Sequence, residues 1–186
     1  RKDRSKRRDH PELRGVGERC VVGFGSSGGP PMMNVLYNNH YQIVQSPGYV
    51  MIMAEMVHDA RIIRLDGKHP PENITPWLGD SIGHWEGNTL VVETTNFNPQ
   101  HTFRAGLRHF FAITSGAIVT ERFTRISKDQ ILYRFYIDDP DIYSQVWAGE
   151  MPLRSVEDKI YEYACHEGNY SMANILAGAR EEEKRR

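Results

Sequence analysis

The chain of 186 residues has a formal net charge of −1, with 39% hydrophobic and 25% charged residues. This composition is typical of a folded globular domain and argues against a largely disordered chain or a globally basic nucleic-acid-binding protein. The most hydrophobic run, residues 49–56, is far shorter than the roughly 18 apolar residues of a membrane-spanning helix, so we expect no membrane span.

The chain begins with a basic segment, because six of its first eight residues are Lys or Arg. Such a block can contact phosphate or acidic lipid. No further basic and aromatic pattern extends it into a binding surface, so we interpret residues 1–19 as a linker and treat nucleic-acid binding as the weaker reading. The run lacks an initiator Met, which suggests an upstream region of the same precursor. Residues 20–186 are expected to form a single β-rich domain with a C-terminal helix.

Residues 23–39 are rich in Gly, Ser, Pro and Asn, which predicts a loop. Residues 23–28 match G-x-G-x-x-G, but Pro30 and Pro31 block the helix that a dinucleotide-binding motif must open, so we reject that motif. After this loop, runs of β-branched and aromatic residues alternate with turn residues and predict strands. These strands are residues 41–46, 49–56, 60–65, 82–87, 89–95, 117–127, 130–138 and 143–151.

The connections predict how these strands pair. Residues 47–48, 87–88 and 128–129 suit two-residue hairpins, which join antiparallel neighbours. Residues 66–81 and 96–116 form longer loops, beyond what a compact hairpin needs. The sequence therefore predicts a meander in which most consecutive strands pair antiparallel.

The last segment has a different pattern. Met172, Ile175, Leu176 and Ala179 follow the spacing of an amphipathic helix. We therefore expect an all-β, mainly antiparallel fold: a calycin or lipocalin-like meander barrel of about eight strands with the C-terminal helix packed across it. A β-sandwich is the alternative.

The segment from His58 to Arg61 is the first candidate site. It places an imidazole, a carboxylate and a guanidinium at a strand junction. In a catalytic reading, His58 is the acid or base, Asp59 orients it, Arg61 stabilises an anion and Glu93 is a second carboxylate. In the alternative reading, a structural turn, Asp59 caps backbone amides and pairs with Arg61.

Strand alternation defines a second set of candidates. If the polar row of the later strands faces inward, Glu93 pairs with Arg122 or Arg134 inside a cavity. If it faces outward, these residues form an exterior ion ladder, which is the favoured interpretation. The aromatic residues Tyr136 and Trp147 supply either core or cavity wall. With Arg122 they are candidate ligand-binding residues.

The two cysteines leave alternatives open. Cys20 and Cys165 are two buried or unrelated thiols in a reducing compartment, but in an oxidising one they could close a loop of about 145 residues, worth about 4 to 5 kcal/mol. His166 beside Cys165 is a further ligand-binding candidate. The paired spacing of metal ligands is missing, so we expect a structural turn, no metal and no cofactor.

Four stretches together resemble a family of uncharacterised exported bacterial proteins: YQIVQ at 41–45, EMVHDARII at 55–63, GDSIGHWEGNTLVVETTNF at 79–97 and YEYACHEGNY at 161–170. The resemblance extends over about residues 18–180. It implies a periplasmic or extracellular location, a disulfide between Cys20 and Cys165, and a chain that is the C-terminal portion of a longer protein. It implies no particular activity.

Two hypotheses about function follow. In the first, the barrel binds a small, partly apolar molecule, with metal-free acid–base catalysis of a lyase, isomerase or hydrolase type as an extension. In the second, the domain is a non-catalytic envelope or assembly module. Its long loops, residues 66–81 and 96–116, then contact partner chains or further copies in a homo-oligomer.

Overall fold

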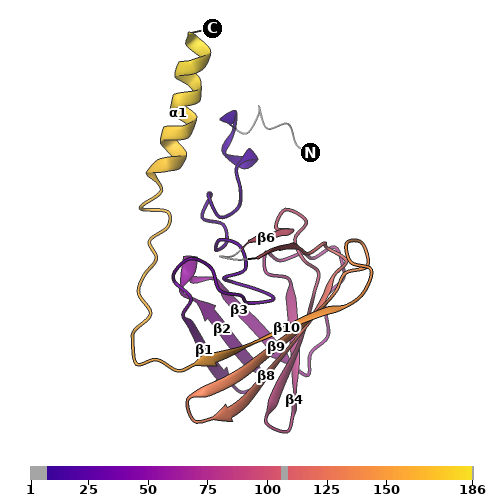
Figure 1. The fold of residues 1–186 in the computed structure, drawn as a ribbon. Coiled ribbons are helices and arrows are strands. Elements are labelled where there is room, and N and C mark those ends of the chain that lie inside the picture. Colours follow the sequence, from indigo (N-terminus) through magenta and orange to yellow (C-terminus); the bar gives the residue numbers. More distant parts are fainter. Residues whose placement is uncertain (1–7, 106–108, 186) are drawn as a thin grey trace.

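The computed structural model describes residues 8–105 and 109–185, in which eight strands form one curled sheet (Figure 1). The strand order is β1-β2-β3-β4-β5-β8-β9-β10. The bounds are β1 Tyr41–Ser46, β2 Tyr49–Ala54, β3 Ala60–Leu65, β4 Asp80–Glu86, β5 Thr89–Thr95, β8 Ile118–Ser127, β9 Gln130–Asp138 and β10 Trp147–Arg154. The expected mainly antiparallel β fold with a C-terminal helix is confirmed.

The predicted strand boundaries hold for four strands and shift for others. The strands predicted at 49–56 and 82–87 are Tyr49–Ala54 and Asp80–Glu86, and a 3-10 turn at Met56–His58 follows the first of them. The strands at 41–46, 60–65, 89–95 and 130–138 have the predicted ends. By contrast, β10 begins several residues later than predicted, because the backbone N–H groups of Ile142 and Tyr143 both bond the carbonyl of Asp139 and extend the turn before it.

One pair of strands departs from a pure meander, since β3 and β4 pair in parallel, with Ile63 opposite Ser81. The connection between them is the predicted long loop. It returns the chain toward the end of the sheet at which β3 begins, so that β4 can run in the same direction as β3. Asn96 holds this loop against the sheet by donating its side-chain amide to the carbonyls of Pro70, Pro71 and Ile74.

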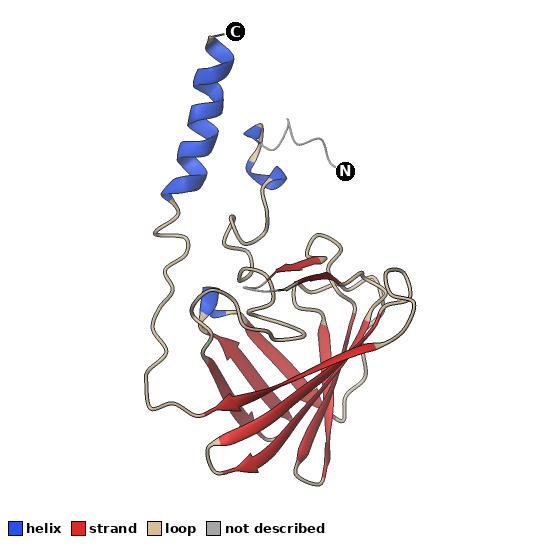
Figure 2. Ribbon diagram, viewed as in Figure 1, coloured by secondary structure: helices blue, strands red, loops and turns tan. Residues whose placement is uncertain are grey.

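The sheet curls without closing. β1 and β10 lie at its two edges, and in the described part of the chain each pairs with one neighbour only, β1 with β2 and β10 with β9. The fold is therefore a half-barrel, and Figure 2 shows its curled sheet. The seam lies between the edge strands β1 and β10. A closed barrel would have removed both edges.

The inner face of the sheet forms the hydrophobic core. Its most buried members alternate along the strands, as expected for side chains that point to one face: Val50, Ile52, Ile63, Val92, Val119, Tyr133, Phe135 and Ile137. The glycine-rich segment enters this interior. Its Met32 is 1% exposed, and the Met32 N–H donates to the Tyr133 hydroxyl at 2.8 Å. The Tyr41 hydroxyl donates to the Ser27 carbonyl at 2.8 Å.

The loop at 96–116 contains a small second sheet that the sequence did not predict. Its strands β6 (Phe103–Ala105) and β7 (Phe110–Ala112) pair antiparallel. Their inner residue Phe111 packs against Trp147 with ring centroids 5.5 Å apart. The small sheet therefore lies over one end of the half-barrel (Figure 1).

The C-terminal helix does not pack across the sheet, so that expectation is wrong. Helix α1 (Tyr170–Lys184) extends away from the half-barrel beside the N-terminal segment (Figure 1). Arg180 donates to the carbonyls of Arg8 and Asp9, and Asn169 caps the helix while donating to the carbonyl of Glu18. Helix α1 is thus joined by hydrogen bonds to residues 8–19 rather than laid across the sheet.

Candidate functional site

A groove of about 940 Å³ lies along the open seam. We call it the seam groove. β1 forms one wall, and the β8–β9 turn and the end of β10 form the other. Side chains of the segment 155–160 also line the groove. Its apolar lining includes Ile43, Met53, Ile131 and Leu153. Such a volume lies within the range of pockets that bind small molecules.

Polar side chains gather at the end of the seam groove near the glycine-rich segment. His58 and His40 line it there. His40 Nδ1 lies 2.9 Å from a carboxylate oxygen of Glu55, whose side chain is buried. Burial alone would raise the pKa of Glu55, but hydrogen bonds from His40 and from the Tyr161 N–H outweigh burial and lower that pKa.

The structure separates the two neighbours His58 and Asp59. Val57 and His58 both have left-handed backbone, with φ of 61° and 55°, which is a strained conformation for the β-branched Val57. After this turn His58 lines the seam groove, whereas Asp59 lines a different hollow of about 360 Å³ beside Arg64. Within the described residues, no hydrogen bond joins the Asp59 carboxylate to the His58 ring, so the predicted contact that would orient the ring is not formed.

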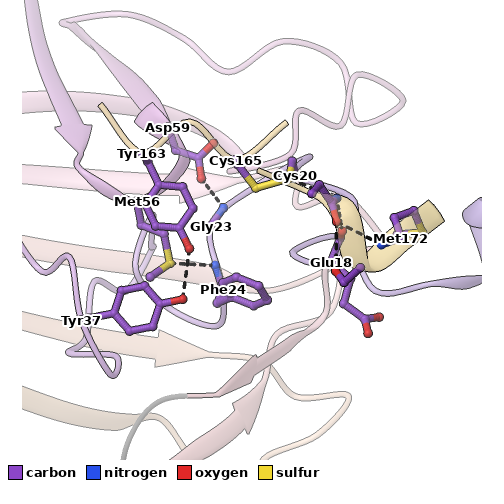
Figure 3. Close-up of a disulfide and its surroundings, with 12 residues drawn as sticks. Glu18, Cys20, Gly23, Phe24, Tyr37, Met56, Asp59, Tyr163, Cys165 and Met172 are labelled. Carbon is purple, nitrogen blue, oxygen red and sulfur yellow. Dashed lines mark hydrogen bonds between the residues drawn. A yellow bond between two sulfur atoms is a disulfide. The ribbon is translucent and has the colours of Figure 1, made fainter. Parts of the chain in front are cut away.

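Asp59 instead holds the glycine-rich segment. Its carboxylate accepts the Gly23 N–H at 2.5 Å (Figure 3). A Cβ on Gly23 would lie 2.3 Å from the Ser27 hydroxyl, so any larger residue there would require the Ser27 side chain to move. Burial raises the pKa of Asp59 to about 6, and the Gly23 hydrogen bond and His58 only partly oppose the rise.

This pKa predicts how stability depends on pH. The folded chain binds the Asp59 proton more tightly than the unfolded chain, so this stabilisation is complete below about pH 4 and is lost as pH rises through about 6. We expect the wild type to lose about 2 to 3 kcal/mol of unfolding free energy between about pH 4 and pH 8 relative to Asp59→Asn, which keeps an acceptor for Gly23. Urea unfolding across this pH range measures it, and parallel pH profiles would contradict it.

Arg61 is buried inside the half-barrel and forms a two-point ion pair there, while its Nε has no hydrogen-bond partner among the described residues. Its guanidinium donates to both carboxylate oxygens of Glu121, at 2.5 and 3.1 Å, and both side chains are almost completely buried. The Tyr133 hydroxyl donates to the same carboxylate at 2.6 Å. Burial, reinforced by Glu121, raises the pKa of Tyr133 well above its usual value. Arg61 therefore neutralises a buried carboxylate and is not free to stabilise a ligand anion.

Glu93 and Arg122 lie on the outer face of the sheet. Arg122 pairs with Glu86 at 2.6 Å, and Arg134 on the next strand pairs with Glu150 at 2.6 Å. This arrangement is the exterior ion ladder that the sequence favoured, and the inward pairing of Glu93 with Arg122 or Arg134 is not formed. The inward carboxylate is Glu121 instead.

Glu93 belongs to a cluster that sequence reasoning missed. Its carboxylate lies 3.3 Å from His69 Nε2, and His69 Nδ1 lies 2.7 Å from Asp80. Arg64 donates to both oxygens of Asp80, and burial, which would raise the pKa of Asp80, is outweighed by the bonds from Arg64 and His69, so that pKa is lowered. No motif links these residues, because the parallel β3–β4 pairing brings them together.

The remaining ligand-binding candidates are spread over the molecule. Tyr136 is exposed on the outer face of β9. Trp147 packs edge-on against Phe135 and Tyr143, which makes it mainly a core residue at the end of the half-barrel. His166 is exposed near the start of α1. None of the three lines the seam groove.

The predicted disulfide is confirmed. Cys20 and Cys165 are joined across 145 residues (Figure 3). Beside it, the rings of Tyr37 and Tyr163 stack with their hydroxyls 3.1 Å apart. The disulfide therefore ties the segment before the glycine-rich loop to the segment that leads into α1.

Two further observations concern metal binding and membrane-spanning helices. Within residues 8–105 and 109–185, no three His, Cys, Asp or Glu side chains are grouped so that they could hold a metal ion. No helix in the same residues is long and apolar enough to cross a membrane. The basic run at residues 1–7 lies outside the described residues.

Comparisons of the chain with family models, with curated proteins and with solved structures each found no significant match. The resemblance to exported bacterial proteins therefore stays a prediction. The function has to be argued from the geometry of the seam groove and its surroundings.

Proposed function

We propose that the protein binds a small, partly apolar molecule in the seam groove. The observation that carries the proposal is a groove of about 940 Å³ that opens between the two edge strands, β1 and β10, beside the core. Tyr41, Ile131 and Leu153 line the groove and also pack against the core cluster. A bound apolar group would cover these side chains and remove their surface from water.

Acid–base catalysis within this proposal falls to His58. Of the four predicted catalytic residues it alone lines the groove, since Asp59 faces the other hollow, Arg61 pairs with Glu121 and Glu93 lies on the outer face. The strained backbone at Val57 and His58 supports a role for this turn. Equal turnover by His58→Ala and wild type, for any substrate found, would exclude it.

We also propose that the protein works in the periplasm or outside the cell. The disulfide supports this location, because disulfides persist mainly in oxidising compartments. The family resemblance points the same way.

The groove proposal predicts a difference between two neighbouring residues of β1. Ile43 is 38% exposed and lines the groove, whereas Val44 is 42% exposed and points to the opposite face of the strand. Ile43→Asn is expected to weaken binding of Nile red and of 1-anilinonaphthalene-8-sulfonate by at least about fivefold, because it puts a polar group where the apolar body lies. Val44→Asn is the matched control and should bind as the wild type does. Fluorescence titration measures both, and saturable binding of neither probe, or equal loss in both variants, would contradict the proposal.

A second candidate function, the assembly module, is favoured by one observation. Phe103 and Phe110 on the small second sheet are 62% and 78% exposed and stack with centroids 6.4 Å apart. Exposed aromatic pairs of this kind mark contact surfaces. Light scattering tests it: a stable oligomer that Phe110→Ser converts to a monomer supports the module, and a monomeric wild type contradicts it.

A further inference from the structure

The charges that line the seam groove are unlike those of the whole chain. Four basic side chains line it, Arg125, Lys128, Arg154 and Lys159, against two acidic ones, Asp129 and Asp158. The chain as a whole has a net charge of −1. The groove is therefore a locally positive region on a nearly neutral protein, which attracts anions.

Most of these basic side chains have no counter-ion. Lys128, Arg154 and Lys159 form no ion pair within the described residues, whereas Arg122 and Arg134 on the outer face are each paired with a glutamate. Arg125 donates to the carbonyls of Ser127 and Lys128 and so stiffens the β8–β9 turn. Unpaired cations at the edge of a groove are available to bind an anionic group of a ligand.

Backbone contacts place the positive charges beside the apolar lining. The Ser155 N–H donates to the Asp129 carbonyl at 2.9 Å, which joins the β8–β9 turn to the end of β10. In the same register Leu153 lies opposite Ile131. Arg154 follows Leu153 and points to the opposite face of β10, but both residues line the groove, because β10 is an edge strand. The apolar and cationic parts of the lining therefore meet across the free edge of β10.

The basic side chains gather at one end of the groove, since Arg125 and Lys128 lie at the β8–β9 turn and Arg154 at the end of β10. At the end near the glycine-rich segment the lining carries His40, which is hydrogen-bonded to the buried Glu55. A ligand with one anionic end thus has one favoured orientation, with its charge at the β8–β9 turn.

We propose that the ligand of the seam groove is an amphipathic anion, with an apolar acyl or aromatic body along Ile43, Ile131 and Leu153 and a carboxylate or phosphate head at Lys128 and Arg154. This inference rests on the proposed function and specifies its ligand class. The body covers the apolar lining, and the head supplies the negative charge that the basic side chains lack.

A matched pair of probes tests the inference. Dansyl-labelled undecanoic acid and its methyl ester share the apolar body and differ in the charge of the head. We expect the acid to bind at least about tenfold more tightly than the ester at low salt, with the difference shrinking as salt is added. The double variant Lys128→Gln/Arg154→Gln should remove this advantage and leave ester binding unchanged.

The control removes two positive charges from the outer face. Arg122→Gln/Arg134→Gln should bind both probes as the wild type does, which separates local contact from net charge. Competition by dodecanoate and by dodecyl phosphate identifies the preferred head group. Equal binding of acid and ester, or an unchanged acid affinity in Lys128→Gln/Arg154→Gln, would overturn the inference while groove binding stands. Binding of neither probe would overturn the proposed function as well.

Discussion

Replacing Glu121 by alanine is expected to lower the unfolding free energy by about 3 to 5 kcal/mol. The substitution leaves the Arg61 guanidinium charged in an interior where its side chain is 2% exposed and Glu121 is its only ion-pair partner in the described residues. It also removes the acceptor of the Tyr133 hydroxyl. Chemical denaturation followed by tryptophan fluorescence measures the loss.

The neighbouring strands offer a matched control for this prediction. Glu150→Ala also breaks an arginine–glutamate pair, with Arg134, but both partners are half exposed on the outer face. Such a pair contributes little, so the variant should unfold almost as the wild type does. Because an apolar pair can replace a buried ion pair, Arg61→Met/Glu121→Leu should recover much of the loss. Equal effects of Glu121→Ala and Glu150→Ala would contradict the prediction.

The fold was largely predictable because local signals determine most of it. Hairpin turns such as residues 47–48 and 87–88 fix antiparallel pairing with a single neighbour, and the strands beside them pair as predicted. The parallel β3–β4 pair was not predictable in this way, because a long loop allows either direction. The helix was predicted from its apolar stripe, but the stripe does not specify which part of the protein the helix lies against. In the structure the helix is bonded to residues 8–19 and not to the sheet.

The site was less predictable than the fold. A run such as His58 to Arg61 suggests one catalytic group, yet the turn at Val57 sends His58 to the seam groove, whereas Asp59 and Arg61 lie at another hollow and bond Gly23 and Glu121. The seam groove depends on where the sheet fails to close, which no local pattern encodes. Arg154 was missed because it lies beyond the predicted end of its strand, and Lys128 because it was read only as a turn residue.

Removing the disulfide is the second large effect that we expect. The double variant Cys20→Ser/Cys165→Ser should lose about 5 kcal/mol of unfolding free energy, because the bond closes a loop of 145 residues in the unfolded chain. In the folded state, hydrogen bonds such as Asn169 to the Glu18 carbonyl and Arg180 to the Arg8 carbonyl still join the two segments.

We therefore expect most of this loss to come from the greater freedom of the unfolded chain and little of it from a change in the folded state. Two measurements distinguish these two origins. A freer unfolded chain exposes more surface, so the denaturant m-value should rise in the variant while the far-ultraviolet circular dichroism of the folded state stays the same. Wild type treated with reductant should match the variant. A loss below about 1 kcal/mol, or an unchanged m-value, would show that the bond does not restrict the unfolded chain as the loop length requires. A changed circular dichroism spectrum would instead locate the effect in the folded state, where the disulfide holds α1 and the N-terminal segment together (Figure 3).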